Sequence, residues 1–577
     1  MRDLQADSVT EPALAMPPAR QATGGSAVRD RIPGWLVALV PAAAEIVVGG
    51  YRIAGPSLWR DEAATISGSQ RPIGAILAMV QNEDAVHGPY YLLMHQVIAV
   101  GGISATALRL PSLFAMCIAV AVTALLARRL AGASGLPAPG LTGLLAGLAL
   151  TAVPLTTRYA QEARPYAMAT MFAVLATYLL VRASAGTRRW WWVLYAAALV
   201  LTGMLNLFAV LLAAAHGVSL LVARRWPKSR PEDSSAGVGG EGAASAEVGA
   251  GRDVAASAEV GAGRDVAASA EVADGTVRRW LVACVAAAVL LAPLAYLSMR
   301  QSAQLNWVTR PGLSALAKLG SDFSGAALGL PVVVLLGWLG CVAGRGARRG
   351  GGLTLVVVAL PWLVLPPAVL LTISLVDPIY VERYVLFCLP ALSLLAAAGL
   401  VWLTELSRPF AVRRGLAGWQ AKAFPLVPSA VLTLLLVSVL VGPQHAVRQA
   451  DARADNLRAV AAVVAGNELP GDAILYLPWK TDLIGVAYPA PFASLRNIGF
   501  GESPTASATL RGLPVSPRVI AARIRTVRRL WTVRWADPLT PDSAAPADLT
   551  RLLTQLRLIG RWRVGSVTVS LYAVRQT

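Results

Sequence analysis

The sequence predicts a mainly α-helical, polytopic membrane protein: a bundle of about eleven transmembrane helices, followed by a small α/β domain outside the membrane. Hydrophobic residues make up 56% of the 577 residues, and charged residues make up only 14%. Soluble domains usually carry about 25% charged residues, so much of this chain is expected to face lipid. The apolar residues also gather in runs of about twenty, the length that a helix needs to cross the hydrocarbon.

The predicted spans occupy the chain between residues 34 and 442. In order, they are about 34–50, 110–127, 139–156, 166–181, 190–203, 207–223, 279–297, 329–343, 353–375, 385–403 and 425–442. Residues 1–33 are rich in polar residues, Pro and Ala and have no apolar core, so we expect a disordered segment on the cytoplasmic side.

The basic residues predict the orientation in the plasma membrane. Short cytoplasmic loops collect Lys and Arg, and a cytoplasmic N-terminus makes every predicted inner loop basic. Those inner residues are Arg128 and Arg129, Arg182, Arg188 and Arg189, Arg224, Arg225, Lys228 and Arg230, Arg345, Arg348 and Arg349, and Arg408, Arg413, Arg414 and Lys422. The net charge of +19 is therefore interpreted as topological, with no nucleic-acid partner.

A repeated segment separates the sixth and seventh predicted spans. The twelve-residue unit at 243–254 recurs at 255–266, and its first half returns at 267–272. Small residues of this kind bury too little apolar surface to offset the entropy of ordering. We therefore expect a disordered cytoplasmic insert over 228–276, without a catalytic role.

The last part of the chain, residues 445–577, has the composition of a soluble domain. An odd number of spans places it outside the cytoplasm. We predict an amphipathic helix at 451–464, strands at 472–478, 530–535 and 567–574, and a helix at 548–558. These alternating elements indicate a small α/β domain.

The first loop, residues 51–109, lies on the outer side and is far longer than a helix connection needs. Asp61 and Glu62 follow the first span closely. Their carboxylates suit a general base or a ligand for sugar hydroxyls, but acidic residues are also typical of the first turn of a solvated helix. Further along, Asp84 and His87 are candidates for a metal ion or for acid–base chemistry, against a purely structural role.

Two shorter outer loops also carry charge. The second loop, 157–166, contains Arg158, Glu162 and Arg164, and planar guanidinium groups suit phosphate oxygens. The third loop, 377–384, presents Glu382 and Arg383. Ion pairs that cap the neighbouring spans are the simpler explanation for both loops. Charged groups on three loops of one side favour an active face directed outward.

Taken together, these motifs resemble the GT-C superfamily of integral-membrane glycosyltransferases, in particular family 39 and the protein O-mannosyltransferase-like group, which includes the ArnT-like lipid A aminoarabinose transferases. The segments that carry the resemblance are Leu58-Trp-Arg-Asp-Glu-Ala63, Asp84 with His87-Gly-Pro-Tyr-Tyr91, Arg109-Leu-Pro-Ser112, Gln161-Glu-Ala-Arg-Pro-Tyr166 and Glu382-Arg-Tyr384. Where related enzymes often have His-Pro-Pro, this chain has His87-Gly88-Pro89.

The resemblance implies transfer of a sugar, such as mannose, from a polyprenyl-phosphate donor to an envelope acceptor, with inversion at the anomeric carbon. The acceptor is left open between protein, lipid and polysaccharide. Asp61 matches the catalytic base of the family, Glu62 would orient the acceptor or Asp61, and arginines would neutralise the departing phosphate. Those arginines are Arg164, Arg158 and Arg383, and the residues expected to line the acceptor site are Asp84, His87, Tyr91, Glu162 and Glu382.

Several alternatives stay open on the sequence. Some relatives use a divalent metal ion and others do not, so a metal at Asp84 and His87 is undecided. A flippase for lipid-linked sugar would place paired charges near the middle of the membrane, where this sequence offers Glu45 alone in the first span. A catalytically inactive envelope scaffold is the third possibility.

Overall fold

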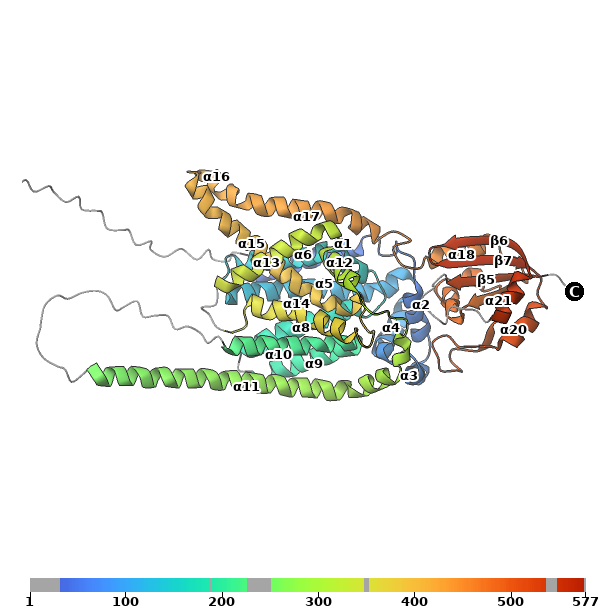
Figure 1. Ribbon diagram of the computed structural model, residues 1–577, viewed down its shortest axis with the longest axis horizontal. Helices are drawn as coiled ribbons and strands as arrows, with labels where there is room; N and C mark the ends of the chain where they lie inside the picture. The colour runs from blue at the N-terminus through green and yellow to red at the C-terminus, as the bar shows by residue number, and fades with distance from the viewer. Residues whose placement is uncertain (1–31, 187, 226–250, 347–351, 536–546, 575–577) are drawn as a thin grey trace, which may run out of the picture.

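The computed structural model describes residues 32–186, 188–225, 251–346, 352–535 and 547–574. A long helical bundle makes up most of the molecule, and a smaller α/β domain lies at one end of it (Figure 1). Helices α2, α3 and α4 of the first loop lie between the two (Figure 1). The predicted fold class is confirmed.

Every predicted span coincides with an apolar helix. These helices are α1 (Gly34–Gly50), α5 (Ala105–Ala133), α6 (Pro139–Ala152) with α7 (Pro154–Ala160), α8 (Tyr166–Ala185), α9 (Trp190–Leu205), η2 (Leu207–Val210) with α10 (Leu211–Arg225), α11 (Gly251–Arg300), α13 (Leu330–Gly346), α14 (Leu355–Ile373), η6 (Glu382–Cys388) with α15 (Leu389–Arg413), and α17 (Val427–Ala446). Among the described residues, eight helices are long and apolar enough to cross a membrane, and the α6–α7 pair, bent by 69°, makes a ninth. Helices α1 and α9, of 17 and 16 residues, complete the set. The chain is a multi-pass membrane protein.

The first loop is helical and not an irregular connection. It contains α2 (Arg60–Ser69), α3 (Ile73–Asn82), the short η1 (Ala85–His87) and α4 (Gly88–Gly101). Helix α5 begins at Ala105, capped by the Ser104 hydroxyl, which accepts a hydrogen bond from the backbone N–H of Ala107. Helix α5 thus begins five residues before the predicted start of the second span at 110, and Arg109 belongs to this spanning helix and not to the loop.

Part of the predicted disordered insert is helical. Residues 226–250 lie outside the described part, but α11 begins at Gly251 and runs through the repeat into the seventh span. The expectation of disorder over 251–276 is therefore wrong. The repeat is rich in Ala, which is the best helix former, and extending an existing helix is far easier than nucleating a new one. The predicted disordered segment at 1–33 lies, up to residue 31, outside the described residues.

Helices α13 and α15 pack closely through glycines. A Cβ added at Gly399 would collide with the backbone oxygen of Leu336, and one added at Gly340 would collide with the backbone oxygen of Leu395. Each helix thus presents a glycine to a carbonyl of the other. Small residues allow this close approach of spanning helices, which matters in a membrane because no hydrophobic driving force acts between the helices.

The C-terminal domain contains a five-stranded sheet in the order β2–β1–β5–β7–β6. Its elements are α18 (Leu457–Ala465), β1 (Ala473–Leu477), α19 (Leu483–Ala487), β2 (Arg496–Asn497), β3 (Phe500–Glu502), β4 (Leu513–Pro514), α20 (Pro517–Ile524), β5 (Arg529–Trp535), α21 (Ala547–Thr554), β6 (Arg557–Val564) and β7 (Val567–Ala573). Strand β1 pairs in parallel with β2 and β5, and β7 pairs antiparallel with β5 and β6. The three predicted strands are present.

Two boundaries in this domain differ from the prediction. Residues 557–558 begin strand β6 and do not end a helix; this edge strand alternates arginines with apolar residues, so its helix and strand signals compete. The first helix begins at Leu457 and not at residue 451, because the Asn456 side chain caps it by accepting from the backbone N–H of Ala459. Residues 451–455 are thereby left free to contact the bundle.

The glycine contact between α13 and α15 leads to a stability prediction. Gly399→Ala should lower the thermal unfolding temperature in detergent, because overpacking a close contact costs about 1–3 kcal/mol. Gly442→Ala is the matched control, since Gly442 of α17 has no atom within 4 Å of an added Cβ. Equal unfolding temperatures for the two variants would contradict this packing.

Candidate active site

The consecutive charged residues Arg60, Asp61 and Glu62 begin helix α2, which follows α1 after the connecting residues 51–59. Successive residues of an α-helix point about 100° apart, so these three face different surroundings. Glu62 faces Arg109 in the bundle, Arg60 faces the C-terminal domain, and Asp61 faces Arg383 of the third loop. The first turn of α2 is the centre of the candidate site.

Glu62 forms a fully buried ion pair with Arg109. Nε and Nη2 of Arg109 donate to the two carboxylate oxygens, each at 2.7 Å. Nη1 of the same guanidinium donates to the backbone oxygens of Ile53 and Pro56. The backbone N–H of Ala163 in the second loop donates to Glu62 at 2.9 Å. The carboxylate of Glu62 is thus occupied by the protein, which favours a positioning role over the acceptor contact that the family resemblance implies.

The carboxylate of Asp61 lies beside two arginines, and one of its oxygens accepts no hydrogen bond. Nη1 of Arg383 lies 3.5 Å from Oδ2 of Asp61, and Nη1 of Arg164 donates to the backbone oxygen of Asp61 at 3.4 Å. Within the described residues, Oδ2 of Asp61 and the Nε atoms of both arginines are buried without a hydrogen-bond partner.

The surroundings of Asp61 decide its charge. Burial raises the pKa of its carboxyl, but the charges of Arg383 and Arg164 outweigh burial and hold the pKa below its usual value. The carboxylate is therefore ionised at neutral pH and can accept a proton.

Arg164 is held by a chain of hydrogen bonds through His87 to Asp84. Nη2 of Arg164 lies 2.7 Å from Nε2 of His87. A guanidinium can only donate, so Nε2 accepts and the imidazole proton lies on Nδ1. Nδ1 donates to Oδ1 of Asp84 at 2.6 Å, and the Tyr91 hydroxyl donates to the other oxygen of Asp84. The chain fixes the position of Arg164.

His87 and Asp84, which this hydrogen bond joins, both have shifted pKa values. Burial, followed by the charge of Arg164, lowers the pKa of His87, which keeps the imidazole neutral. Burial acts to raise the pKa of Asp84, but the hydrogen bonds from His87 and Tyr91 and the positive charge of Arg164 outweigh it and lower the pKa. A neutral imidazole between a carboxylate and a guanidinium is consistent with the assigned proton positions.

Asp84 and His87 do not fit a metal ion in this arrangement. Both nitrogens of the imidazole are hydrogen-bonded within the protein, and both oxygens of Asp84 are engaged. A cation at Nε2 would also face the guanidinium of Arg164. Among the described residues, no group of three or more His, Cys, Asp or Glu side chains is arranged to hold a metal.

Aromatic rings surround the guanidinium of Arg383. Its Cζ lies 5.6 Å from the ring centroid of Trp307, 5.8 Å from that of Tyr384 and 5.9 Å from that of Tyr166. Such contacts stabilise a cation through the quadrupole of the ring. They hold Arg383 against Asp61 without neutralising it.

Glu162 is buried in a separate cluster, beside the buried Arg453 and the partly exposed Arg158. Nε of Arg453 lies 3.6 Å from Oε2 of Glu162, and Nε of Arg158 lies 3.9 Å from the same oxygen. Arg453 also donates to the backbone oxygens of Arg158 and Gln161. Burial raises the pKa of Glu162 despite these cations. Sequence reasoning missed Arg453, which comes from the segment after the last span.

Glu382 does not join Asp61, although its neighbour Arg383 does. Its Oε1 lies 3.1 Å from Nζ of Lys318 in helix α12 (Leu313–Ser324), and Lys318 also pairs with Asp322 at 2.7 Å. Sequence reasoning did not single out Lys318. The three loops therefore meet as predicted, but only Asp61, Arg164, Arg383 and the His87 chain form one connected set.

Comparisons with known proteins agree with this architecture. Residues 87–232 match the family model described as dolichyl-phosphate-mannose-protein mannosyltransferase. The crystal structure of ArnT from Cupriavidus metallidurans in the apo state is similar, with a TM-score of 0.52 at 15% identity, covering 93% of this chain and 98% of that chain. The same protein bound to undecaprenyl phosphate gives a TM-score of 0.51 at 16% identity, with the same coverage. The chain has the GT-C fold.

The predicted resemblance to the GT-C superfamily is thereby confirmed, and the family match supports a glycosyltransferase of the GT-C type. The archaeal oligosaccharyltransferase AglB from Archaeoglobus fulgidus is a more distant match, with a TM-score of 0.45 at 11% identity, covering 94% of this chain and 74% of that chain. Among curated proteins, no sequence match to this chain is found.

The C-terminal domain is attached directly to the first turn of α2. Nε and Nη2 of Arg60 donate to the two oxygens of Asp455 at 2.6 and 2.8 Å. The Ser566 hydroxyl donates to Asp455 at 2.7 Å, and the Arg60 guanidinium lies 4.4 Å from the ring centroid of Trp535. The residue next to Asp61 is therefore held by the C-terminal domain.

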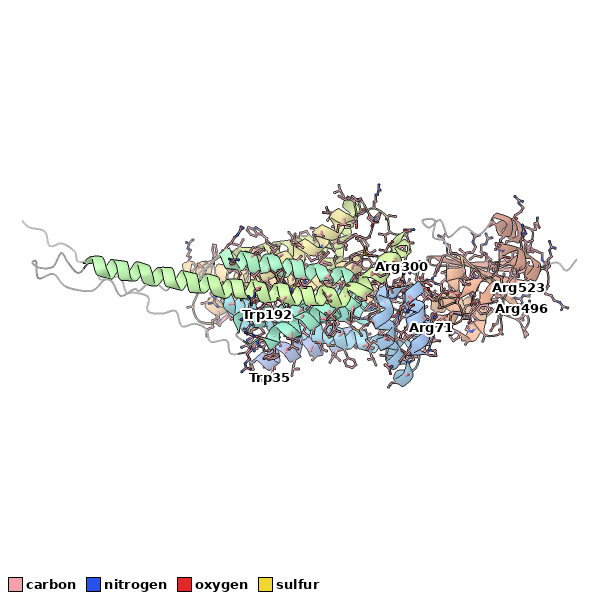
Figure 2. All side chains as sticks on the ribbon, turned by 90° about the horizontal axis from the view of Figure 1, so that it is seen from below. Trp35, Arg71, Trp192, Arg300, Arg496 and Arg523 are labelled. Atoms are coloured by element: carbon pink, nitrogen blue, oxygen red, sulfur yellow. The ribbon has the colours of Figure 1, made fainter. Side chains whose placement is uncertain are left out.

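A second contact strengthens the attachment at the other end of α2. Arg71 lies at the junction between the bundle and the C-terminal domain (Figure 2). It donates to the backbone oxygens of Thr509 and Leu510, and the Ser67 hydroxyl donates to Leu510 at 2.6 Å. Both ends of α2 thus contact the C-terminal domain.

Removing the carboxylate of Asp455 should loosen the start of α2. Asp455→Ala eliminates a charge-assisted pair of the kind worth about 1.5–3 kcal/mol, so amide hydrogen exchange in residues 57–62 should become faster. Asp451→Ala, at an exposed position of the same segment, should leave that exchange unchanged. Identical exchange in both variants would show that the Arg60–Asp455 pair does not hold the loop.

Proposed function

We propose that the protein transfers a sugar from a polyprenyl-phosphate donor to an acceptor hydroxyl, with Asp61 as the general base. The proposal rests on one observation: the ionised carboxylate of Asp61, one oxygen of which accepts no hydrogen bond, lies beside Arg164 and Arg383, and the Nε of each arginine donates none. One base and two fixed cations are what this reaction needs. The solved ArnT complex with undecaprenyl phosphate supports a lipid-phosphate donor for this fold.

The transfer is a single displacement. The acceptor oxygen attacks the anomeric carbon from the side opposite the phosphate, and the carbon–oxygen bond to the phosphate breaks. The bonding electrons leave with the polyprenyl phosphate, so the configuration of the sugar inverts. Asp61 takes the proton of the acceptor hydroxyl, a contribution typically worth about 10² to 10⁴ in rate.

Arg164 and Arg383 stabilise the phosphate as its negative charge develops. Fixed cations in a buried site act more strongly than in water and need no reorganisation during the reaction. The hydrogen bonds from His87 and Asp84 position Arg164, and the aromatic rings position Arg383. Arg158, half-exposed near Glu162, is the third cation that can face the lipid phosphate.

The face that carries the C-terminal domain is the outer face in this proposal, and the protein lies in the plasma membrane. Mannose is the sugar favoured by the description of the matching family. The acceptor is an envelope protein, lipid or polysaccharide. The C-terminal domain, attached to Arg60 and Arg71, would form one wall of its entrance.

The distribution of charge favours a transferase over a flippase. The connected set around Asp61 lies where the loops meet the C-terminal domain, and a transport path would need such groups near the middle of the membrane. Among the described residues of α1, the acidic side chain at spanning depth is Glu45, which is fully buried.

Asp61→Asn should reduce transfer by about 10² to 10⁴ while the protein expresses and inserts normally. The substitution keeps the shape of the side chain but removes its ability to take a proton. Transfer is measured in membranes with polyprenyl-phosphate-mannose, by the release of polyprenyl phosphate. Asp377→Asn, at an exposed position of the third loop, should retain full activity. Full activity in Asp61→Asn would eliminate Asp61 as the base.

Arg383→Gln should move the acidic limb of the pH–rate profile. Arg383 is the largest of the charges that lower the pKa of Asp61, so its removal raises that pKa. The ionised base is present only above its pKa, and the acidic limb should therefore shift to higher pH. Arg310→Gln removes the charge of an exposed arginine and should leave the pH–rate profile unchanged. An unshifted limb in Arg383→Gln would mean that the limb does not report Asp61.

A further inference from the structure

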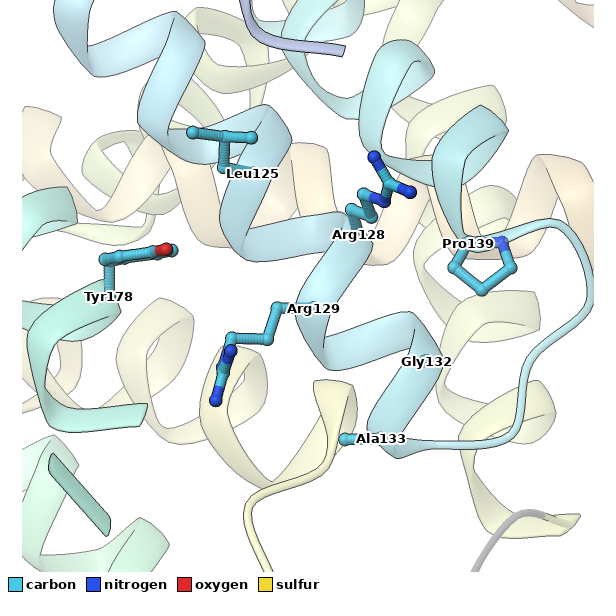
Figure 3. Close-up of a pocket in the computed structure, with 7 residues that line it drawn as sticks. All are labelled: Leu125, Arg128, Arg129, Gly132, Ala133, Pro139 and Tyr178. Carbon is cyan, nitrogen blue, oxygen red and sulfur yellow. The ribbon is translucent and has the colours of Figure 1, made fainter. Parts of the chain in front are cut away.

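Two adjoining hollows lie at the end of the bundle opposite the C-terminal domain. The first, of about 390 Å³, is lined by Arg128, Arg129 and Tyr178 among others. The second, of about 400 Å³, is lined by Arg129, Arg182, Arg188 and Trp191. Arg129 of α5 and Tyr178 of α8 approach the first hollow from different helices (Figure 3). Arg129 joins the two hollows into one basic surface.

Basic residues at this membrane face also follow from topology, because inner loops collect Lys and Arg. The orientation of the protein in the membrane requires only that Lys and Arg be present in the inner loops, and it does not require their side chains to gather. Here the side chains converge on shared hollows, and the described residues that line them include no aspartate or glutamate. The guanidinium of Arg182 is held 4.9 Å from the ring centroid of Trp191. Arginines from different helices therefore share one open, basic surface.

The arginines of this site repel one another. Arg129 and Arg182 come from α5 and α8 and line the same hollow, so two positive charges share one site. Like charges brought together in this way destabilise the fold unless an anion lies between them. The planar guanidinium groups match phosphate oxygens, to which arginine donates in pairs.

The position of the hollows indicates which phosphate they bind. They lie at the ends of spanning helices α5, α8 and α9, where Tyr178 and Trp191 are residues typical of the membrane interface. Their volumes fall in the range of small-molecule sites, about 300–1,000 Å³. We propose that these hollows bind the phosphate of an anionic lipid headgroup at the membrane face opposite the candidate active site. This binding is separate from the proposed transfer reaction and does not depend on it.

The test is native mass spectrometry of the purified full-length protein with added phosphatidylglycerol or phosphatidylcholine. The wild type should retain phosphatidylglycerol over phosphatidylcholine. The double variant Arg129→Gln/Arg182→Gln should reduce this retention by about tenfold or more, which corresponds to about 1.4 kcal/mol. The matched control Arg413→Gln/Arg414→Gln removes the same charge near the end of α15, from residues that line neither hollow.

Three results would overturn the proposal. Equal retention in the wild type and the Arg129/Arg182 variant would show that these residues do not bind lipid. An equal loss in the control would show that net charge alone attracts the lipid. Displacement of phosphatidylglycerol by millimolar inorganic phosphate, with phosphate itself retained, would assign the site to a soluble anion. If the double variant does not fold, Arg188→Gln, at an exposed position, replaces it, with the same outcomes.

Discussion

The buried ion pair between Glu62 and Arg109 is the interaction on which the site depends. Two charges taken out of water are costly unless their remaining hydrogen-bonding atoms are satisfied. Here the guanidinium also binds backbone oxygens of the first loop, and the carboxylate accepts from the second loop. One pair thus joins a spanning helix to two loops. Loss of either partner would leave an uncompensated buried charge, which typically costs about 3–5 kcal/mol.

The first turn of α2 is held at two points, and this attachment fixes the position of Asp61. Glu62 is fixed to the bundle and Arg60 to the C-terminal domain, so Asp61 between them has little freedom. The residue that is proposed to react is the one whose neighbours are both immobilised. Preorganisation of this kind is how a fixed base and fixed cations become more effective than the same groups in water.

The two ends of the bundle use arginine differently. Near the C-terminal domain, arginines are interleaved with carboxylates and aromatic rings, and each has a defined partner, as Arg109, Arg164 and Arg383 show. At the opposite end, Arg129 and Arg182 share a hollow without an acidic neighbour among the described residues that line it. The first arrangement suits a reaction in which charge moves, and the second suits stable binding of an anion.

The sequence by itself determined the spans, the three charged loops, the strands β1, β5 and β7, and Asp61 as the candidate base. Apolar length, alternation and family motifs are local properties, so they can be read along the chain. Edge strand β6 and the extension of α11 were missed because their local signals compete or are weak. Only the tertiary structure decided which charge meets which: Glu62 with Arg109, Arg60 with Asp455, Arg453 with Glu162, and Lys318 with Glu382. These partners lie far apart in sequence, and the strength of an ion pair depends on distance and burial, which only the packed fold provides.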